Sequence, residues 1–274
     1  MEQKSSIGLG LRTAAAVICA LIVLFPVLWM VAMVFKPADV MFARPTVFFY
    51  TPTLANFAYV IEQGFVNNLI TSLALGIFST ILVVIIGTPA AYSFARFELK
   101  AKEDLFLFIL ASRMAPPVCL VIPFYLIYAK VGLLDTFVGL SLAYMTFNLS
   151  FYVWVLRSFC RDLPVELEEA AILEGWSKAQ VFRRIVFPLL RNGIVATSVL
   201  CFIFAWNEFL FAFMLGGDSV QPLPVAIPKL ITAQGVRWGE VAVVGVVSLI
   251  PVLAVVVLLQ RHIVRGLTMG AVKG

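Results

Sequence analysis

Residues 163–188 read LPVELEEAAILEGWSKAQVFRRIVFP and form a polar island in an otherwise apolar chain. The island carries four glutamates and several basic residues, and long hydrophobic runs flank it on both sides. Charged side chains are costly within a bilayer, so a segment of this composition is expected outside the membrane while its flanks cross it. The island therefore indicates a chain that passes repeatedly through a bilayer.

The composition of the whole chain supports this class. Its 274 residues are 62% hydrophobic and only 13% charged, and the mean hydropathy is +1.03. That leaves too little polar surface to cover a water-soluble globule of this length. We therefore expect an all-α integral membrane protein.

Six membrane-spanning segments are predicted from the spacing of the charged residues. A helix needs roughly 20 apolar residues to cross the hydrocarbon core. Four charge-free runs reach that length, between residues 12 and 36, 62 and 96, 135 and 157, and 240 and 261. Two further apolar segments, 105–129 and 192–215, are long enough but each contains one charged residue.

This count divides the chain into three parts: an N-terminal transmembrane helix with an extracytoplasmic segment (1–66), a core of five transmembrane helices that includes the island at about 161–188 (67–260), and a cytoplasmic tail (261–274). Basic residues are concentrated before the first span, in the island and after the last span. The positive-inside rule therefore places both termini in the cytoplasm, with the chain in the cytoplasmic (inner) membrane. The net charge of +5 then needs no nucleic acid to explain it.

Metal, disulfide and nucleotide sites are not expected in this chain. The four cysteines form no C-x-x-C pair, and His262 is the only histidine, which argues against a zinc site. The G-x-x-x-x-G-K-[ST] phosphate loop does not occur in the sequence. We therefore assign no catalytic residue and no cofactor.

The island itself predicts a helix, a turn and a second helix. Asp162 is expected to cap the first helix and Pro164 to lie in its first turn, where a missing N–H costs nothing. That helix is expected to run through Glu174, and Gly175 supplies a residue that adopts a positive φ at a helix C-terminus.

The second helix of the island carries a capping-box signature. Ser177 is followed three positions later by Gln180, so that each side chain can bond a neighbouring backbone N–H. Pro188 is expected to end this helix or to kink it. On physical grounds alone, a docking site for a partner and a solvated loop both fit this pattern.

The spacing within the island resembles the EAA loop of permease subunits in binding-protein-dependent ABC importers. The resemblance rests on Glu169-Ala170-Ala171, three intervening residues, Gly175, nine further residues and Ile185-Val186-Phe187-Pro188. Two further segments, 206–211 and 265–274, resemble the carbohydrate-type permeases of the maltose-transporter group. Phe187 departs from the Leu that is usual in the family, and Glu174 from the Asp that commonly precedes the glycine.

This resemblance implies the type I ABC importer permease fold, with six transmembrane helices and a cytoplasmic helix-turn-helix coupling loop. Glu169 would pair with a basic group on a separate ATPase, and Gly175 would form the bend. The coupling residues implied in this way are Glu168, Glu169, Ala170, Ala171, Gly175, Ile185 and Pro188. The implied partners are a second permease subunit, two ABC ATPase subunits that bind ATP and Mg²⁺, an extracytoplasmic solute-binding protein, and a sugar or polyol moved by alternating access.

Polar residues inside the spans suggest a path for the solute. A charge at a helix centre costs about 2.5–3.5 kcal/mol, which makes Arg113 and Glu208 functional candidates. At about 1.5 Å per residue they lie roughly 12 and 25 Å from the cytoplasmic ends of their spans, so we do not expect them to pair. Asn148 and Asn207 can bond sugar hydroxyls, and Tyr152 can stack on a sugar ring. The alternative that such polar groups only join helices stays open.

Prolines are expected to interrupt the third span. Pro116, Pro117 and Pro123 free backbone carbonyls that must be satisfied inside protein or in a wet cavity. The alternative function is a stand-alone ion-coupled secondary transporter that uses Arg113 and Glu208. That class predicts inverted repeats, which are not apparent in the sequence, and it leaves the island unexplained.

Overall fold

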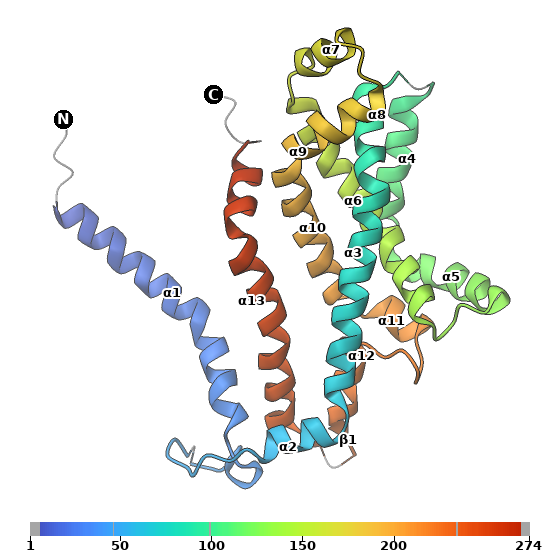
Figure 1. Cartoon of the computed structure of the whole chain (residues 1–274). Helices are drawn as coiled ribbons and strands as arrows, with labels where there is room; N and C mark the ends of the chain where they lie inside the picture. Colours follow the sequence, from blue (N-terminus) through green and yellow to red (C-terminus); the bar gives the residue numbers. More distant parts are fainter. Residues whose placement is uncertain (1–5, 46, 99, 234, 270–274) are drawn as a thin grey trace. The chain divides into compact units, whose positions relative to one another are not determined.

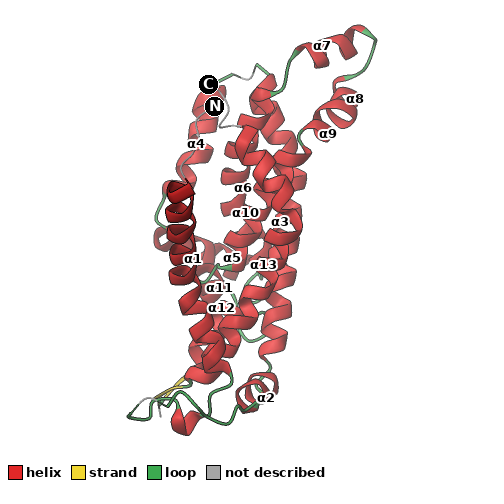
Figure 2. Cartoon of the chain, turned by 90° about the vertical axis from the view of Figure 1, so that its left-hand side faces the viewer, coloured by secondary structure: helices red, strands yellow, loops and turns green. Residues whose placement is uncertain are grey.

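The computed structural model describes residues 6–45, 47–98, 100–233 and 235–269, and these are mostly helical (Figures 1 and 2). The long helices are α1 (Ser6–Val34), α3 (Phe65–Arg96), α4 (Lys102–Met114), α5 (Pro117–Val131), α6 (Phe137–Asp162), α10 (Arg191–Trp206) and α13 (Trp238–Met269). The short ones are α2 (Ala55–Glu62), α7 (Glu166–Leu173), α8 (Lys178–Val181), α9 (Phe187–Leu189), α11 (Leu210–Leu215) and α12 (Leu223–Ala226). A π-helical turn (Phe182–Val186) and two 3₁₀ turns (Ala38–Val40, Ile227–Leu230) complete the helical segments.

The chain divides into two compact units. The first contains the chain up to Val66 together with Ile227–Ile250, and the second contains Asn67–Ala226 and the chain from Pro251 onward. Helix α13 contributes to both units, because the division falls inside it. The helix continues past Arg261, and residues 270–274 of the expected cytoplasmic tail lie outside the described part of the chain.

The first unit joins α1 to the segments that follow it through a buried amide. Asn56 Nδ2 donates to the carbonyl oxygens of Val34 (2.8 Å) and Lys36 (3.1 Å), so α2 is fixed to the end of α1. A two-residue antiparallel hairpin, β1 (Ile231–Thr232) with β2 (Gly235–Val236), precedes α13. It is drawn in yellow in Figure 2. The guanidinium of Arg237 then lies 4.0 Å from the ring centre of Tyr59 on α2.

Four helices, within α1, α3, α6 and α13, are long and apolar enough to cross a membrane by themselves. Two bent pairs add to them: α4 and α5 meet at 97°, and Lys178–Leu189 and α10 meet at 71°. The first bend falls at Pro116 and Pro117, where Pro117 begins α5. A proline at this position lacks an N–H that the start of a helix does not use. The predicted interruption of this span is therefore present.

Contacts at one end of the second unit show which helix ends lie together there. Arg96, the last residue of α3, donates from Nη2 to the carbonyl oxygen of Leu163 at 2.7 Å. Arg157 of α6 pairs with Glu103 at the start of α4. The end of α3, the start of α4 and the end of α6 therefore lie together, and Figure 1 shows α7 and α8 beside them.

A different group of segments meets at the opposite end of the second unit. Asn68 Nδ2, near the start of α3, donates to Gln221 O at 2.7 Å. Asp135, just before α6, accepts a hydrogen bond from Val220 N at 2.9 Å. The α4–α5 pair, and α10 together with α11, each run from one end of α6 to the other, as expected of one broken span each. Together with α1, α3, α6 and α13 they give the six predicted spans.

The core of the second unit is closely packed around α6. Tyr152 and Leu156 of this helix are fully buried, in a cluster that includes Val83 and Ala91 of α3 and Cys201 of α10. A Cβ atom on Gly87 would lie 2.5 Å from the Tyr152 ring. The glycine therefore allows α3 to pass this close to α6.

Two details of the island differ from the sequence-based expectation, because Pro164 lies before the first island helix and not in its first turn, and because that helix has another N-cap residue. Asp162 does not cap the first island helix, because it is the last residue of α6. Leu163 is extended (φ −75°, ψ 134°), as expected for a residue that precedes a proline. The first island helix, α7, therefore begins at Glu166, and Val165 precedes it without a side-chain cap.

Candidate functional site

The island folds as two short helices joined by a tight turn, as the sequence predicted. Gly175 has φ +93°, a conformation that residues with a side chain rarely adopt. It directly follows Glu174, the C-cap residue of α7. Ser177 and Gln180 form the expected capping box: Gln180 N donates to Ser177 Oγ at 3.3 Å, and Ser177 N donates to Gln180 Oε1 at 2.8 Å. The loop therefore has a defined shape beyond the ends of the spans.

One face of α7 is fixed to the end of α3. Glu168 is only 7% exposed; its Oε1 accepts from Arg96 Nε at 2.7 Å and its Oε2 accepts from Tyr92 Oη at 2.6 Å. Ala171, one turn further along α7, is also buried, and Ile185 is half-buried against the same core cluster. These residues position the loop.

The exposed residues of the loop combine apolar side chains with acids. Glu169, Ala170, Gly175 and Pro188 are exposed. The apolar side chains Leu167, Ile172 and Leu173 are exposed as well, and Leu173 reaches 89%. Apolar side chains on a segment outside the spans are typical of a surface that another protein covers.

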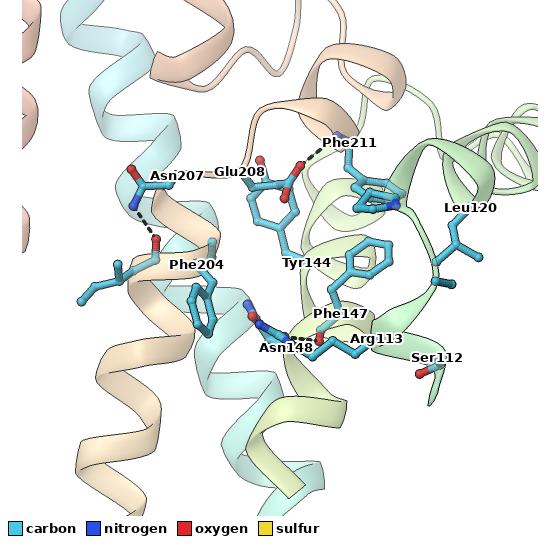
Figure 3. Close-up of a pocket in the computed structure, with 14 residues that line it drawn as sticks. Ser112, Arg113, Leu120, Tyr144, Phe147, Asn148, Phe204, Asn207, Glu208 and Phe211 are labelled. Carbon is cyan, nitrogen blue, oxygen red and sulfur yellow. Dashed lines mark hydrogen bonds between the residues drawn. The ribbon is translucent and has the colours of Figure 1, made fainter. Parts of the chain in front are cut away.

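A cavity of about 310 Å³ lies between α4, α5, α6 and the α10–α11 break (Figure 3). Its walls combine aromatic rings with a few polar groups. The residues that line it include Ser112, Arg113, Leu120, Tyr144, Phe147, Asn148, Phe204, Asn207, Glu208 and Phe211. Arg113, Asn148, Asn207 and Glu208, four of the five residues that the sequence placed along a solute path, therefore share one cavity.

Arg113 is held at this cavity by aromatic rings. Its guanidinium lies 4.9 Å from the ring centre of Phe151 and 4.8 Å from that of Phe204. Nη1 donates to the carbonyl oxygen of Phe147 at 3.0 Å (Figure 3). Arg113 and Glu208 form no ion pair with each other in the described part of the chain, in agreement with their expected separation.

The span that carries Glu208 is broken, a feature that the sequence analysis missed. Helix α10 ends at Trp206 and α11 begins at Leu210. Across the break Glu208 Oε1 accepts from Phe211 N at 3.0 Å, and Asn207 Nδ2 donates to Ile203 O at 2.7 Å (Figure 3). A carboxylate that accepts a backbone N–H at the start of a helix is a capping arrangement, and no proline or glycine marks this break in the sequence.

On α6, one of the two predicted solute-path residues lines the cavity and the other does not. Tyr152 does not line the cavity: it is fully buried in the core, and its hydroxyl lies 2.8 Å from Thr88 Oγ1. Asn148 does line it, with Nδ2 donating to Cys201 O at 3.2 Å. Tyr144, which the sequence analysis did not select, is 2% exposed at the cavity wall, and its hydroxyl has no hydrogen-bond partner among the described residues. Its position one turn before Asn148 on the same face of α6 was the signal.

A family model decides the class of this protein. Residues 84–269 match the model described as "binding-protein-dependent transport system inner membrane component". The chain belongs to this family. The match includes the island and the cavity, so both lie in the part that the family shares.

Individual members of the family are similar over nearly their whole length. The trehalose transport system permease protein SugB of Mycobacterium tuberculosis is 36% identical over 97% of this chain and 100% of its own. The diacetylchitobiose uptake permease DasC of Streptomyces coelicolor is 33% identical over 99% and 100%. The trehalose/maltose permease MalG of Thermococcus litoralis is 33% identical over 94% and 95%.

A solved structure of the same class supports the fold. A chain of a bacterial ABC transporter involved in the import of the acidic polysaccharide alginate superposes with a TM-score of 0.75, at 23% identity, over 95% of this chain and 98% of that chain. The inner membrane component described here therefore has the fold of an ABC importer permease. It is a multi-pass membrane protein.

Proposed function

We propose that this chain is one permease subunit of an ATP-driven importer that moves a sugar or polyol across the cytoplasmic membrane by alternating access. Support for the solute class comes from relatives whose names specify trehalose, diacetylchitobiose and maltose. The cavity is consistent with such a solute, because aromatic rings and hydrogen-bonding groups together bind sugars. No similarity favours the alternative of an ion-coupled transporter.

The observation that carries the coupling role is the exposed face of α7 and its turn. Leu173 is 89% exposed beside Glu169 and Ala170, on a loop of defined shape. A surface that combines apolar side chains with acids fits a cleft on an ATPase that offers an apolar wall and basic residues. The loop would transmit the closure of two ATPase subunits around ATP and Mg²⁺ to the spans.

The remaining partners follow from this role. A second permease subunit would complete the translocation path, and an extracytoplasmic solute-binding protein would deliver the sugar. Both termini of this chain would lie in the cytoplasm, on the same side as the loop. Of the residues at the cavity, Arg113, Asn148, Asn207 and Glu208 would face the solute.

The docking role is tested by Glu169→Lys and Leu173→Asp. Both side chains are exposed, so both variants should insert and fold normally but lose co-purification with the ATPase and lose uptake. Glu98→Lys, an exposed acid that follows α3 and lies outside the loop, is the control and should keep both. Wild-type uptake in the first two variants would contradict the docking role.

The solute is tested separately. Cells that lack this chain should lose uptake of labelled trehalose, diacetylchitobiose or maltose, and the chain should restore it on re-expression. Calorimetry on the purified solute-binding protein would rank the three sugars. Unchanged uptake of all three, together with no binding, would contradict the proposed solute class.

A further inference from the structure

Two consecutive glutamates of α7 differ in exposure. Glu169 is exposed on the docking face, whereas Glu168 is 7% exposed and its carboxylate faces the end of α3. Both carboxylate oxygens of Glu168 are used inside the chain. Glu168 is therefore not free to bind the ATPase, although its place in the sequence suggested that role.

We propose that Glu168, Arg96 and Tyr92, named here the α7–α3 clasp, hold the coupling loop to α3 so that the two move as one body. Displacement of α7 by the ATPase would then be transmitted directly to a membrane span. The clasp positions the loop and does not itself touch the ATPase. This inference rests on the proposed docking role of α7.

The hydrogen bonds of the clasp reach two places in the loop: the backbone just after α6 and the side chain of Glu168 on α7. Arg96 donates from Nε to Glu168 Oε1 at 2.7 Å and from Nη2 to Leu163 O at 2.7 Å. Tyr92 Oη donates to Glu168 Oε2 at 2.6 Å. Tyr92 and Arg96 are four residues apart and lie on one face of α3. One helical turn of α3 therefore binds both the residue that follows α6 and the carboxylate of α7.

The second half of the loop rests on the same turn of α3. The Tyr92 ring packs against Phe182 of the π-helical turn, with ring centres 5.1 Å apart, and against Phe97, with ring centres 5.6 Å apart. Lys178 Nζ of α8 lies 5.1 Å from the Phe97 ring centre. Because both helices of the loop contact this turn, the loop cannot tilt independently of α3 without breaking the clasp.

Helix α3 continues from the clasp to the opposite end of the second unit. Between Arg96 and Asn68 it covers about 42 Å at 1.5 Å per residue. At that far end Asn68 Nδ2 donates to Gln221 O at 2.7 Å, and Ser72 Oγ accepts from Leu223 N at 2.7 Å. A shift of the clasp would therefore reach the segment before α12 along one continuous helix, which contains Pro89 next to the clasp.

The test uses Glu168→Gln in the complete importer, reconstituted with its ATPases, partner permease and solute-binding protein, with trehalose as the probe. The neutral side chain keeps its volume but loses the charge that pairs with Arg96. We expect ATPase co-purification to remain at the wild-type level. Stimulation of ATP hydrolysis by trehalose-loaded binding protein should fall roughly tenfold, the factor to which a lost charged hydrogen bond corresponds.

Three further variants separate positioning from a general loss of structure. Glu98→Gln removes an exposed charge that lies near the end of α3 but outside the loop, and it should behave as wild type. Tyr92→Phe keeps the ring packing and removes one hydrogen bond, so it should lower stimulation several-fold with basal hydrolysis unchanged. Arg96→Glu combined with Glu168→Arg should recover part of the stimulation that each single reversal loses.

Two results would overturn the clasp. Wild-type stimulation of ATP hydrolysis in both Glu168→Gln and Tyr92→Phe would show that coupling through α7 does not need the clasp. If Glu168→Gln fails to insert into the membrane, the result for Tyr92→Phe decides. Loss of ATPase co-purification in Glu168→Gln, as expected for Glu169→Lys, would instead make Glu168 a docking contact. Failure of the docking role is recognised independently, by normal co-purification in Glu169→Lys and Leu173→Asp.

Discussion

At the scale of single residues, Asp135 fixes the turn between α5 and α6 to the segment that follows α11. Its carboxylate accepts from Ser219 N at 3.1 Å and from Val220 N at 2.9 Å. Partial burial acts to raise the pKa of this group, but the backbone hydrogen bonds from Ser219 and Val220 outweigh it and lower the pKa below its ordinary 3.8. Ionised Asp135 is therefore favoured in the folded protein.

The sign of the pH dependence follows from this lowered pKa. A depressed pKa contributes stability that is fully present above the unfolded value and is lost as pH falls through the folded value. Asp135→Asn, which keeps one acceptor and tolerates the positive φ of 51°, should cost about 1 kcal/mol at neutral pH. Thermal unfolding in detergent should show a constant gap between wild type and variant down to about pH 4. A gap that closes between pH 7 and 5 would contradict this assignment.

The sequence could not separate the roles of Glu168 and Glu169. Both are acids in the first turn of α7, where the helix dipole favours either of them. Only the contact with Arg96, distant in the sequence, shows that Glu168 faces inward. The sequence could not place Tyr152 for the same reason. One face of α6 carries both residues that line the cavity and residues that are fully buried, and the sequence shows only that they share this face.

At the scale of elements, the turn between α7 and α8 depends on the backbone of Gly175. No atom lies within 4 Å of the position that a Cβ would occupy there, so any effect of substitution comes from φ and not from a clash. Gly175→Val should therefore cost about 1–3 kcal/mol locally and weaken the response of the ATPase to loaded binding protein. Gly175→Asn, which adopts positive φ more readily, should cost much less. Equal effects of the two variants on ATPase stimulation would contradict a backbone origin.

The elements that the sequence predicted correctly are those that depend on neighbouring residues in the chain. The Gly175 turn, the Ser177–Gln180 capping box and the interruption at Pro116–Pro117 each depend on residues next to one another in the chain, and all three are present. The break between α10 and α11 has no proline or glycine, and it is stabilised by the Glu208 carboxylate. A break of this kind is visible only when the side chain is seen to accept a backbone N–H.

At the scale of the whole molecule, hydropathy alone leaves the number of spans between four and six. The count depends on α4–α5 and on α10–α11, because each of these interrupted segments could either cross the membrane or return to its starting side. Contacts at both ends of α6 favour crossing: Arg157 with Glu103 at one end, and Asp135 with Val220 at the other. Composition cannot supply such contacts, and for this reason the predicted count of six needed the structure for support.

Labelling with a membrane-impermeant maleimide tests both the count and the orientation. Single cysteines at the exposed positions Phe49, Leu173 and Asp218 should divide into two groups in intact spheroplasts of a strain without the ATPase, which would otherwise cover Leu173. Phe49→Cys and Asp218→Cys should be labelled from outside, and Leu173→Cys only after permeabilisation, because six crossings with a cytoplasmic N-terminus put the loop inside. The unsubstituted chain, with its four natural cysteines, gives the background. If α4 and α5 instead returned to the cytoplasmic side, α6 would run outward and Leu173→Cys would be labelled in intact spheroplasts, which would contradict both the six-span count and the docking of α7 to a cytoplasmic ATPase.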